Sequence, residues 1–408
     1  RGTFEQSMVT AAPSVLVVSH LFPRPDQLVS GTFVLDQVKA LRDRGVDARV
    51  LTGRFVVARR PHQLLAHWKT RPPIIRREWE GVPVYEVECP VWLPQVGYPY
   101  HYRSTISAAA LNLVREFPFR VVHAHTSLLD GFAAAAIGLS LRLPYVVTEH
   151  STTIRAWRRN VVHRRILKQV LSGAAQVFAV SEALRSTLCE DSRVARNGRI
   201  CVMPNGVDLK LFSVPFKWTP DPNAPRFAFV GRLAPVKNVS GLLRAFAMIR
   251  SEIRHAQLRI LGDGPQRNEL AGLVDDLGIS NAVTFEGASP RQRVAEVLCN
   301  WADCLVLPSF VETFGCVVIE SLACGKPVVA TPSGGPEEIL TGGELGKLVP
   351  VGDDHALAEA LRGVAVRLSN IDPFRLRESV RTRFSIESIS ERLTETYVRL
   401  STSGLPNA

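Results

Sequence analysis

The stretch from Asp303 to Leu340, DCLVLPSFVETFGCVVIESLACGKPVVATPSGGPEEIL, decides the fold of this 408-residue chain. Its apolar run 304–307 predicts a buried parallel strand, followed by a loop and then a helix over 315–324. Glu312 then lies on the loop and Glu320 within the helix. About three extended and about five helical residues place the two carboxylates roughly 10 Å apart, so that one acid can contact each end of an elongated ligand.

The same alternation of short β-rich runs with helical stretches continues along the whole chain. It predicts an α/β fold in which parallel sheets are covered by helices on both faces. The strands expected in a first sheet are 14–19, 48–52, 121–124, 145–148, 177–180 and 200–203. Those expected in a second sheet are 227–230, 258–261, 283–285, 304–307 and 328–330.

These runs predict two domains. We expect an N-terminal domain over 8–208 and a linker over 209–224, because residues 208–225 contain four prolines and no clear periodicity. A C-terminal domain over 225–384 and a final helical segment over 385–408 complete the chain. Ligands of open parallel sheets lie outside the carboxyl ends of the strands, so two such domains define a cleft.

Six ordered segments carry a resemblance to a known family. The pair Glu312 and Glu320 resembles the E-x7-E signature of the retaining glycosyltransferases of family 4, which have the GT-B fold of two facing Rossmann-like domains. Further matching segments are RFAFVGRLAPVKNVSGLLRAFAM (226–248), LRILGDGP (258–265), VMPNGVD (202–208), TFEG (284–287) and GGPEE (334–338). The N-terminal half matches only in pattern. The resemblance also implies that the last helix crosses back onto the first domain.

Two cations follow the strand that ends at Val230. Arg232 and Lys237 flank a turn, where they can bind a diphosphate and neutralise the charge that builds on it as it leaves. They would replace a metal ion, and no Asp-x-Asp pair follows a strand, so we expect no metal and no cofactor. The alternative is a surface arginine and lysine beside a turn.

The start of the helix after Glu312 is a second anion site. Gly315 follows Phe314, and the exposed amides and dipole of a helix start favour a phosphate near Cys316 and Val317. The resemblance places the donor phosphates against this turn. Gly31, before a helix of the first domain, predicts a smaller version of the site, although an ordinary helix cap explains it equally well.

The resemblance also implies a role for each of the two glutamates. Glu320 would accept hydrogen bonds from the ribose hydroxyls, and Glu312 would contact the transferred sugar. The alternatives are a helix salt bridge and a loop cap. The family's chemistry is described as front-face substitution, in which the departing diphosphate helps to deprotonate the acceptor hydroxyl, so positioning and charge stabilisation supply most of the rate.

The nucleotide base is expected near two further post-strand loops. Gly262, Asp263 and Gly264 form one loop, and Glu286 follows the next strand. The two glycines would equally serve loop geometry, since glycine tolerates positive φ. The pattern does not distinguish uridine from guanosine.

Histidines end two strands of the first domain. His125 and His150 fall where loops enter the cleft, and the resemblance gives His125 a contact with the sugar or diphosphate, while His150 is a candidate acceptor contact. Structural roles are the alternative for both. We expect His123 to be a core residue and Asp130 to cap the following helix.

The run VGYPYHYR, 96–103, is a candidate acceptor site. Tyr98 and Tyr100 present rings suited to stacking on a sugar, and Arg103 adds a cation. The same residues would also serve to pack a loop against the first domain.

The formal charge of +11 is clustered in part. Residues 54–77 contain seven basic side chains and no acid, and 154–168 contain six with Trp157 among them. A solvated helix face and a surface for an anionic membrane or acceptor both fit. Nucleic acid is not expected, since no DNA or RNA module is visible.

Cysteine usage and hydropathy bear on location. The seven cysteines show no CxxC pair and no zinc spacing, and no apolar run reaches the roughly 18 residues of a membrane span. We therefore expect reduced thiols and a cytoplasmic protein, with peripheral contact at the inner membrane face left open.

The function expected from the sequence is transfer of a hexose or N-acetylhexosamine from a nucleotide diphosphate sugar to a hydroxyl acceptor, with retention and without a metal. Its acceptor would be a lipid-linked or polysaccharide intermediate, which fits the basic charge, and the alternative is a soluble natural product. Alternatives are a GT-B nucleotide-sugar epimerase and a non-catalytic protein that binds nucleotide sugars or anionic membranes.

Overall fold

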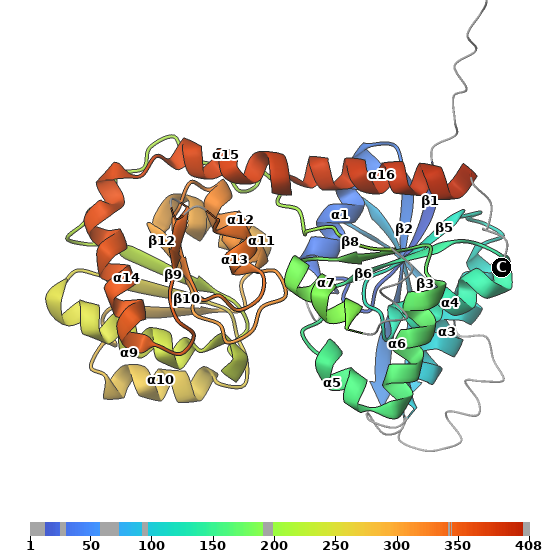
Figure 1. The fold of residues 1–408 in the computed structure, drawn as a ribbon, viewed down its shortest axis with the longest axis horizontal. Coiled ribbons are helices and arrows are strands. Elements are labelled where there is room, and N and C mark those ends of the chain that lie inside the picture. The colour runs from blue at the N-terminus through green and yellow to red at the C-terminus, as the bar shows by residue number, and fades with distance from the viewer. Residues whose placement is uncertain are drawn as a thin grey trace, which may run out of the picture.

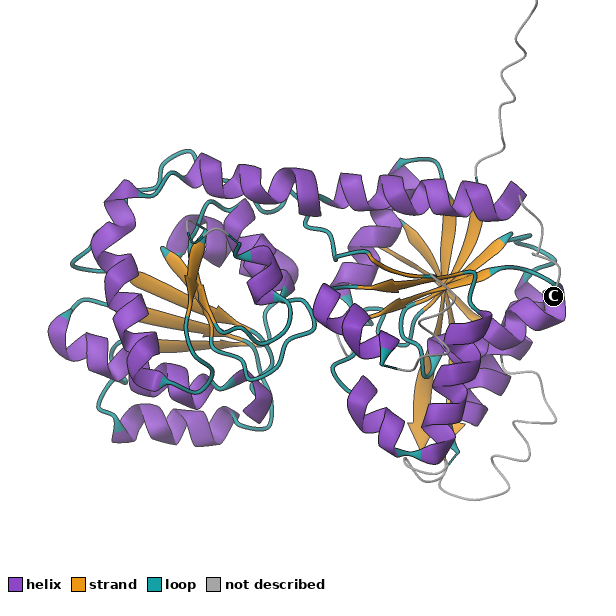
Figure 2. Cartoon of the chain, in the orientation of Figure 1, coloured by secondary structure: helices purple, strands orange, loops and turns teal. Residues whose placement is uncertain are grey.

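Two parallel sheets, each covered by helices on both sides, form the two halves of the molecule (Figures 1 and 2). The computed structural model describes residues 13–24, 30–57, 73–91, 97–190, 199–341, 343 and 345–402. The predicted α/β fold class with two parallel-sheet domains is confirmed.

The first sheet has eight strands in the order β3-β4-β2-β1-β5-β6-β7-β8. All its neighbours are parallel except β3 and β4, which pair antiparallel. That hairpin is missing from the sequence prediction, although Gly81 at φ 81° marks its turn. The strands are β1 (Ser14–Val18), β2 (Asp47–Val57), β3 (Ile75–Trp79), β4 (Val82–Val91), β5 (Val121–Ala124), β6 (Tyr145–Glu149), β7 (Gln176–Ala179) and β8 (Ile200–Val202).

The second sheet has six strands in the order β11-β10-β9-β12-β13-β14, all parallel. Its central strand β12 is fully buried, as expected for an apolar run between helical layers. The strands are β9 (Arg226–Val230), β10 (Gln257–Leu261), β11 (Val283–Gly287), β12 (Cys304–Leu307), β13 (Val328–Ala330) and β14 (Gly346–Leu348).

Helices follow most strands, and polar side chains cap several of them. The Asn160 side chain accepts hydrogen bonds from the backbone amides of Val162 and His163 at the start of one helix, and the Ser181 side chain accepts one from Leu184 at the start of another. The helices of the first half are α1 (Thr32–Asp43), α3 (Tyr98–Leu113), α4 (Asp130–Leu141), α5 (Ile154–Arg159), α6 (Val161–Gly173) and α7 (Glu182–Cys189). Those of the second half are η1 (Pro235–Lys237), α9 (Val239–Glu252), α10 (Arg267–Asp276), α11 (Arg291–Glu296), η2 (Val297–Trp301), α12 (Cys316–Ala323), α13 (Pro336–Ile339), α14 (Asp354–Arg367), η3 (Leu368–Asn370), α15 (Pro373–Phe384) and α16 (Ile386–Thr402).

The chain crosses between the two halves twice, and the crossings are hydrogen-bonded to each other. Val207 donates to the carbonyl of Phe384 at 2.7 Å and accepts from the amide of Ile386 at 3.0 Å. Beyond this point α16 runs along the first domain, where Ile389, Leu393 and Tyr397 are buried in the core beneath α1 (Figure 1). The return of the last helix to the first domain therefore occurs as the resemblance implied.

The segment between β8 and β9 is held against the second domain. Phe212 is fully buried, and Trp218 donates from Nε1 to Asp303 at 2.9 Å. The Arg377 guanidinium donates to the carbonyls of Leu209 and Phe212. Because these contacts fix the segment to the second domain, the first of the two crossings between the domains lies in the short stretch around Val207.

Candidate active site

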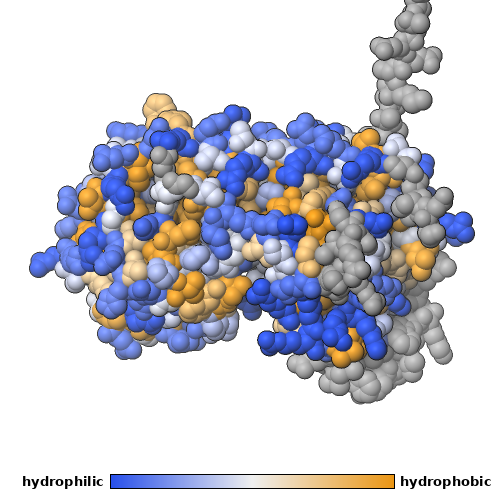
Figure 3. Space-filling model, in the orientation of Figure 1, coloured by the Kyte–Doolittle hydropathy of each residue, from blue (hydrophilic) through white to orange (hydrophobic). Residues whose placement is uncertain are grey.

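A cavity of about 730 Å³ lies between the domains, at the carboxyl ends of β9, β10 and β12. Figure 3 shows the molecule hollowed between the two domains on the side away from α15 and α16. Most of the wall comes from the second domain, and the loop before α1 closes it from the first. The lining residues are Ser30, Thr32, Val230, Gly231, Arg232, Lys237, Leu261, Gly262, Asp263, Ala288, Ser289, Arg291, Val294, Leu307, Glu312, Gly315, Cys316, Val317 and Glu320.

The two predicted cations both line this cavity. Arg232 is exposed just after β9, and Lys237 ends the short helix η1. Lys237 Nζ lies 2.5 Å from Glu312 Oε1, which also accepts from the Ser309 hydroxyl at 2.7 Å. The cavity therefore holds one lysine–carboxylate pair and one exposed guanidinium at the end of the same strand.

The glycine turn at Gly315 has the geometry expected for anion binding. Gly315 has φ 87° and precedes α12 with no side chain capping the first amides, so these point into the cavity beside Cys316 and Val317. Phe314 is an exception to the prediction. Its side chain is buried and packs on Phe384 at 5.7 Å between ring centroids, so it belongs to the core and not to the donor site.

Gly31 also fits the predicted phosphate-facing loop. It has φ 62°, and a Cβ there would lie 1.8 Å from the carbonyl oxygen of Leu21. Only glycine fits that approach, which brings Ser30 and Thr32 to the cavity wall. The first domain thus presents an uncapped helix start to the opposite domain.

The loop after β10 is shaped by close backbone contacts. A Cβ on Gly262 would lie 1.9 Å from Gly231 O, and one on Gly264 would lie 2.4 Å from Leu233 O. Asp263 lines the cavity. Glu286 does not line it: its carboxylate binds Arg293 at 2.7 Å and Arg259 at 3.3 Å. Two arginines thus engage the Glu286 side chain, and the expectation that the base lies near this loop does not depend on that side chain.

Glu320 lies within α12 as predicted, but its partner was not foreseen. Arg291 Nη1 lies 3.5 Å from Glu320 Oε1, while Arg291 Nη2 lies 2.6 Å from Asp36 Oδ2 on α1 of the first domain. Burial raises the pKa of Glu320, and Arg291 opposes that shift. Burial likewise raises the pKa of Asp36 to about 6, against the pull of Arg291. No sequence pattern marks this contact, because its members lie in different domains.

The two candidate histidines of the first domain form a stacked pair. Their ring centroids are 5.3 Å apart at 10°, with His125 Nδ1 3.1 Å from His150 Nε2. Burial lowers the pKa of His125 to about 4 and that of His150 well below its usual value, so both imidazoles are neutral at pH 7. Neither ring lines the 730 Å³ cavity. His123 is a core residue as predicted, bonded to Tyr397 and Thr148.

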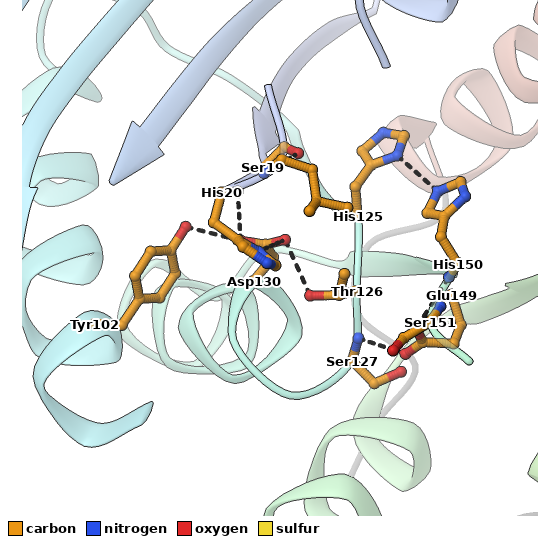
Figure 4. A network of polar contacts seen from close by, with 11 residues as sticks. Ser19, His20, Tyr102, His125, Thr126, Ser127, Asp130, Glu149, His150 and Ser151 are labelled. Atoms are coloured by element: carbon orange, nitrogen blue, oxygen red, sulfur yellow. Dashed lines mark hydrogen bonds and ion pairs between the residues drawn. The ribbon is translucent and has the colours of Figure 1, made fainter. Parts of the chain in front are cut away.

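Asp130 is the centre of a buried network at the ends of β1 and β5 (Figure 4). It accepts from the His20 amide at 3.0 Å, from His20 Nδ1 at 2.9 Å, from the Tyr102 hydroxyl at 2.7 Å and from the Thr126 hydroxyl at 3.0 Å. The prediction of a simple helix cap is wrong, because the carboxylate turns inward and ties three segments together. Burial alone would lower the pKa of His20, but Asp130 raises it above its ordinary value.

A second buried acid shapes the neighbouring loop. Glu149, at the end of β6, accepts from the amides of Ser127, His150 and Ser151 at 2.7–2.9 Å. Burial raises its pKa, and these hydrogen bonds oppose the shift. In Figure 4 both acids lie below the histidine pair, Asp130 beside His20 and Glu149 next to His150. Neither acid was a predicted site residue, since its partners come from segments that the sequence does not show to be neighbours.

The predicted acceptor residues lie on helix α3, not on a loop. Tyr100 meets Phe132 edge-on at 5.3 Å, and Arg103 lies over the same ring at 4.6 Å. Tyr98 packs edge-on to His163 at 6.1 Å. None of the three lines the cavity, because their rings and guanidinium pack on neighbouring helices.

The second basic segment forms helices α5 and α6, where hydrophilic residues gather in Figure 3. Arg158 pairs with Glu190 at 2.9 Å, and Val161 and Val162 are exposed between the arginines. Residues 58–72 of the first basic segment lie outside the described residues. Within the described ranges no helix is long and apolar enough to cross a bilayer, and no group of three or more His, Cys, Asp or Glu is placed to hold a metal ion.

Comparison with known proteins gives a consistent result over both domains. Residues 30–211 match "Glycosyltransferase Family 4", and residues 213–365 match "Glycosyl transferases group 1". D-inositol 3-phosphate glycosyltransferase of Nocardia farcinica is 30% identical over 308 residues, covering 69% of this chain and 67% of that protein. The putative teichuronic acid biosynthesis glycosyltransferase TuaC of Bacillus subtilis is 27% identical over 360 residues, covering 85% and 88%.

Solved structures show the same architecture. Sucrose-phosphate synthase from Thermosynechococcus elongatus superposes with a TM-score of 0.75 at 22% identity, covering 95% of this chain and 99% of that one. Anabaena Alr3699/HepE in complex with UDP gives 0.69 at 21% identity, covering 94% and 99%. The predicted GT-B fold is confirmed.

Proposed function

This chain belongs to the group 1 glycosyltransferases of family 4, and we propose that it moves a hexose or N-acetylhexosamine from a nucleoside diphosphate sugar to a hydroxyl acceptor with retention of configuration. The observation that carries the proposal is the interdomain cavity in which Arg232 and Lys237 share one wall with Glu312 and Glu320. Cations for a diphosphate and carboxylates for hydroxyl groups are the chemistry that a nucleotide sugar requires.

In this proposal the donor lies along the wall of the second domain. Glu320 accepts hydrogen bonds from the ribose, and the base lies near Asp263 and Ser289. The diphosphate lies between Lys237 and the open amides at Gly315. These groups come from the ends of several strands, so the sheet holds them rigidly before the donor arrives.

Charge stabilisation supplies the main rate effect in this scheme. As the bond from the anomeric carbon to the diphosphate breaks, negative charge grows on the leaving oxygen, and Arg232 and Lys237 compensate it in a partly enclosed site. The acceptor hydroxyl attacks from the same face, and a diphosphate oxygen takes its proton. Two fixed cations supply here the positive charge that a metal ion would otherwise provide, so we propose transfer without a metal.

Glu312 contacts the transferred sugar in the proposal. Its Oε1 is held by Lys237 and Ser309, so the carboxylate position is defined before the sugar binds. A bound diphosphate would compete for Lys237 and release part of the Glu312 carboxylate towards the sugar hydroxyls. The pair therefore couples the phosphate and sugar ends of the donor.

The acceptor is proposed to approach from the first domain, past the ends of β1, β5 and β6. Three histidines lie at these strand ends, on loops that Asp130 and Glu149 hold by hydrogen bonds: His20, His125 and His150 (Figure 4). The neutral imidazoles of His125 and His150 suit uncharged hydroxyls. We retain a lipid-linked or polysaccharide acceptor, and contact of α5 and α6 with anionic lipid, as part of the proposal.

Two measurements test the proposal in sequence. Thermal shifts with UDP and GDP select the base, since a ligand that binds only the folded state raises Tm. The matching nucleotide sugar is then incubated with the protein and EDTA, and release of nucleoside diphosphate is followed. Release that requires added magnesium or manganese would contradict metal-free transfer. Binding without release or transfer would indicate a non-catalytic binding protein, and an epimerised nucleotide sugar would indicate the epimerase alternative.

A further inference from the structure

Arg291 connects Glu320 of the second domain to Asp36 of the first domain. The residue begins α11 in the second domain, yet its guanidinium reaches Asp36 on α1 of the first, at 2.6 Å, and Glu320 on α12 at 3.5 Å. All three side chains are nearly buried, with 12–13% of each exposed. A cation placed between two carboxylates from different domains is an element that a domain movement must make or break.

The guanidinium is not saturated by these contacts. The ion pair with Asp36 is short, but its angles are not those of a hydrogen bond, so Arg291 Nε and Nη2 and Asp36 Oδ2 are buried without a hydrogen-bond partner among the described residues. Buried N–H groups without an acceptor are unfavourable, because they have lost their hydrogen bonds to water. Arg291 also lines the cavity, next to Glu320 on the same wall.

The surroundings of Arg291 are negative. Asp36, Glu320 and Asp208 all act on it, and the Phe212 ring lies 5.1 Å from its Cζ and limits its position. Without the arginine, Glu320 would be a buried carboxylate with no counterion, and such groups protonate. A protonated carboxyl offers a weaker acceptor to ribose hydroxyls than a carboxylate does.

From this geometry we infer that Arg291 is the positioning residue for ribose recognition: it keeps Glu320 ionised and aimed at the ribose, and through Asp36 it links the filled site to the first domain. The inference rests on the proposed function, because it assumes that a nucleoside diphosphate fills the cavity. Arg291 and Asp36 then couple donor binding to closure of the cleft.

The test uses the full chain and four probes: UDP, GDP and their 2′-deoxy forms, titrated by calorimetry. We expect Arg291→Gln to weaken binding of the preferred ribonucleotide about tenfold and to bring the ratio of ribo to deoxyribo affinity close to one, because one charge-assisted contact is lost. The loss grows as the pH falls from 8 to 6, since Glu320, left with the Asp36 carboxylate and the Cys316 and Cys324 thiols as its titratable neighbours, protonates. Arg291→Lys restores part of the discrimination.

Two further variants separate positioning from general damage. Arg226→Gln removes a partly buried arginine that pairs with Asp303 at the far end of β9, and we expect a lower Tm with an unchanged ribose preference. Asp36→Asn should keep ribose discrimination but reduce the compaction that the nucleotide causes in small-angle scattering.

The outcomes separate a failure of the role inferred for Arg291 from a failure of the proposed function. If the wild-type protein binds neither UDP nor GDP, the proposed function fails and the inference fails with it. If it binds one of them and Arg291→Gln discriminates ribose from deoxyribose as well as the wild type does, only the inference is overturned. Compaction of Asp36→Asn equal to that of the wild type overturns the link between the domains.

Discussion

Lys237 Nζ lies 2.5 Å from Glu312 Oε1, which joins the loop after β9 to the loop after β12 at the cavity wall. The lysine is 22% exposed and the glutamate 9%, so the pair is shielded but open to a ligand on one side. Because the two loops belong to adjacent strands, the pair spans the place where the proposed diphosphate and sugar meet.

Lys237→Ala should lower turnover about 100- to 1,000-fold, since it removes one preorganised charge from the leaving group. The fold should persist, because the lysine lies at the surface of the cavity. The measurement is kcat for release of nucleoside diphosphate. Lys347→Ala, on the exposed side of β14, is the matched control, and turnover of Lys237→Ala equal to that control would remove Lys237 from the site.

Asp130→Asn should destabilise the first domain by roughly 3–5 kcal/mol, because it removes a buried charge that accepts four hydrogen bonds. Urea unfolding followed by circular dichroism measures the change. A cost below about 1 kcal/mol, the range of a surface substitution, would show that the network adds little to the fold.

The pH dependence of stability should report the pair formed by His20 and Asp130. Asp130 raises the pKa of His20 in the folded state, so the stabilisation is complete below the unfolded value near 6.5 and is lost as pH rises through the folded pKa. The free energy of unfolding of wild type minus that of His20→Gln should therefore be larger at pH 5.5 than at pH 8.5. His255→Gln, at an exposed position, provides the reference, and a difference that grows towards high pH would contradict the assignment.

Tyr397→Phe should loosen the last helix from the first domain. The Tyr397 hydroxyl lies 2.6 Å from Nδ1 of the buried His123, and its loss leaves that nitrogen without a partner at a cost of about 1–3 kcal/mol. Amide exchange in α16 should accelerate, while the exposed Tyr100→Phe leaves it unchanged. Unaltered exchange would mean that apolar packing alone fixes the helix.

Glu338→Ala should weaken the contact between the domains behind the cleft. Its carboxylate accepts hydrogen bonds from the backbone amides of Glu182 at 2.7 Å and Ala183 at 2.8 Å, and so caps helix α7 of the opposite domain. We expect about 1 kcal/mol of lost stability and faster amide exchange in the first turn of α7. Glu359→Ala, on an exposed face of α14, is the comparison, and equal exchange in both variants would rule out a capping role.

Sequence patterns predicted the structure correctly wherever the residues of a short segment determine its geometry. The strand, loop and helix over 304–324, the cations after β9 and the turn at Gly315 follow from apolar runs, glycines and strand ends, and they lie where predicted. The patterns did not predict whether a side chain points into the core or into the cavity. Phe314 packs into the core, and Tyr100 and Arg103 pack on Phe132.

What the sequence by itself determined is the α/β architecture and the cavity wall of the second domain, because periodicity and turn chemistry act over a few residues. Only the tertiary structure decided that Arg291 meets Asp36, that His20 and Tyr102 converge on Asp130, and that His123 holds Tyr397. Each of these contacts joins segments far apart in the chain, and its partners are chosen by burial: a polar group removed from water must find whatever counterpart the packed domains bring within reach.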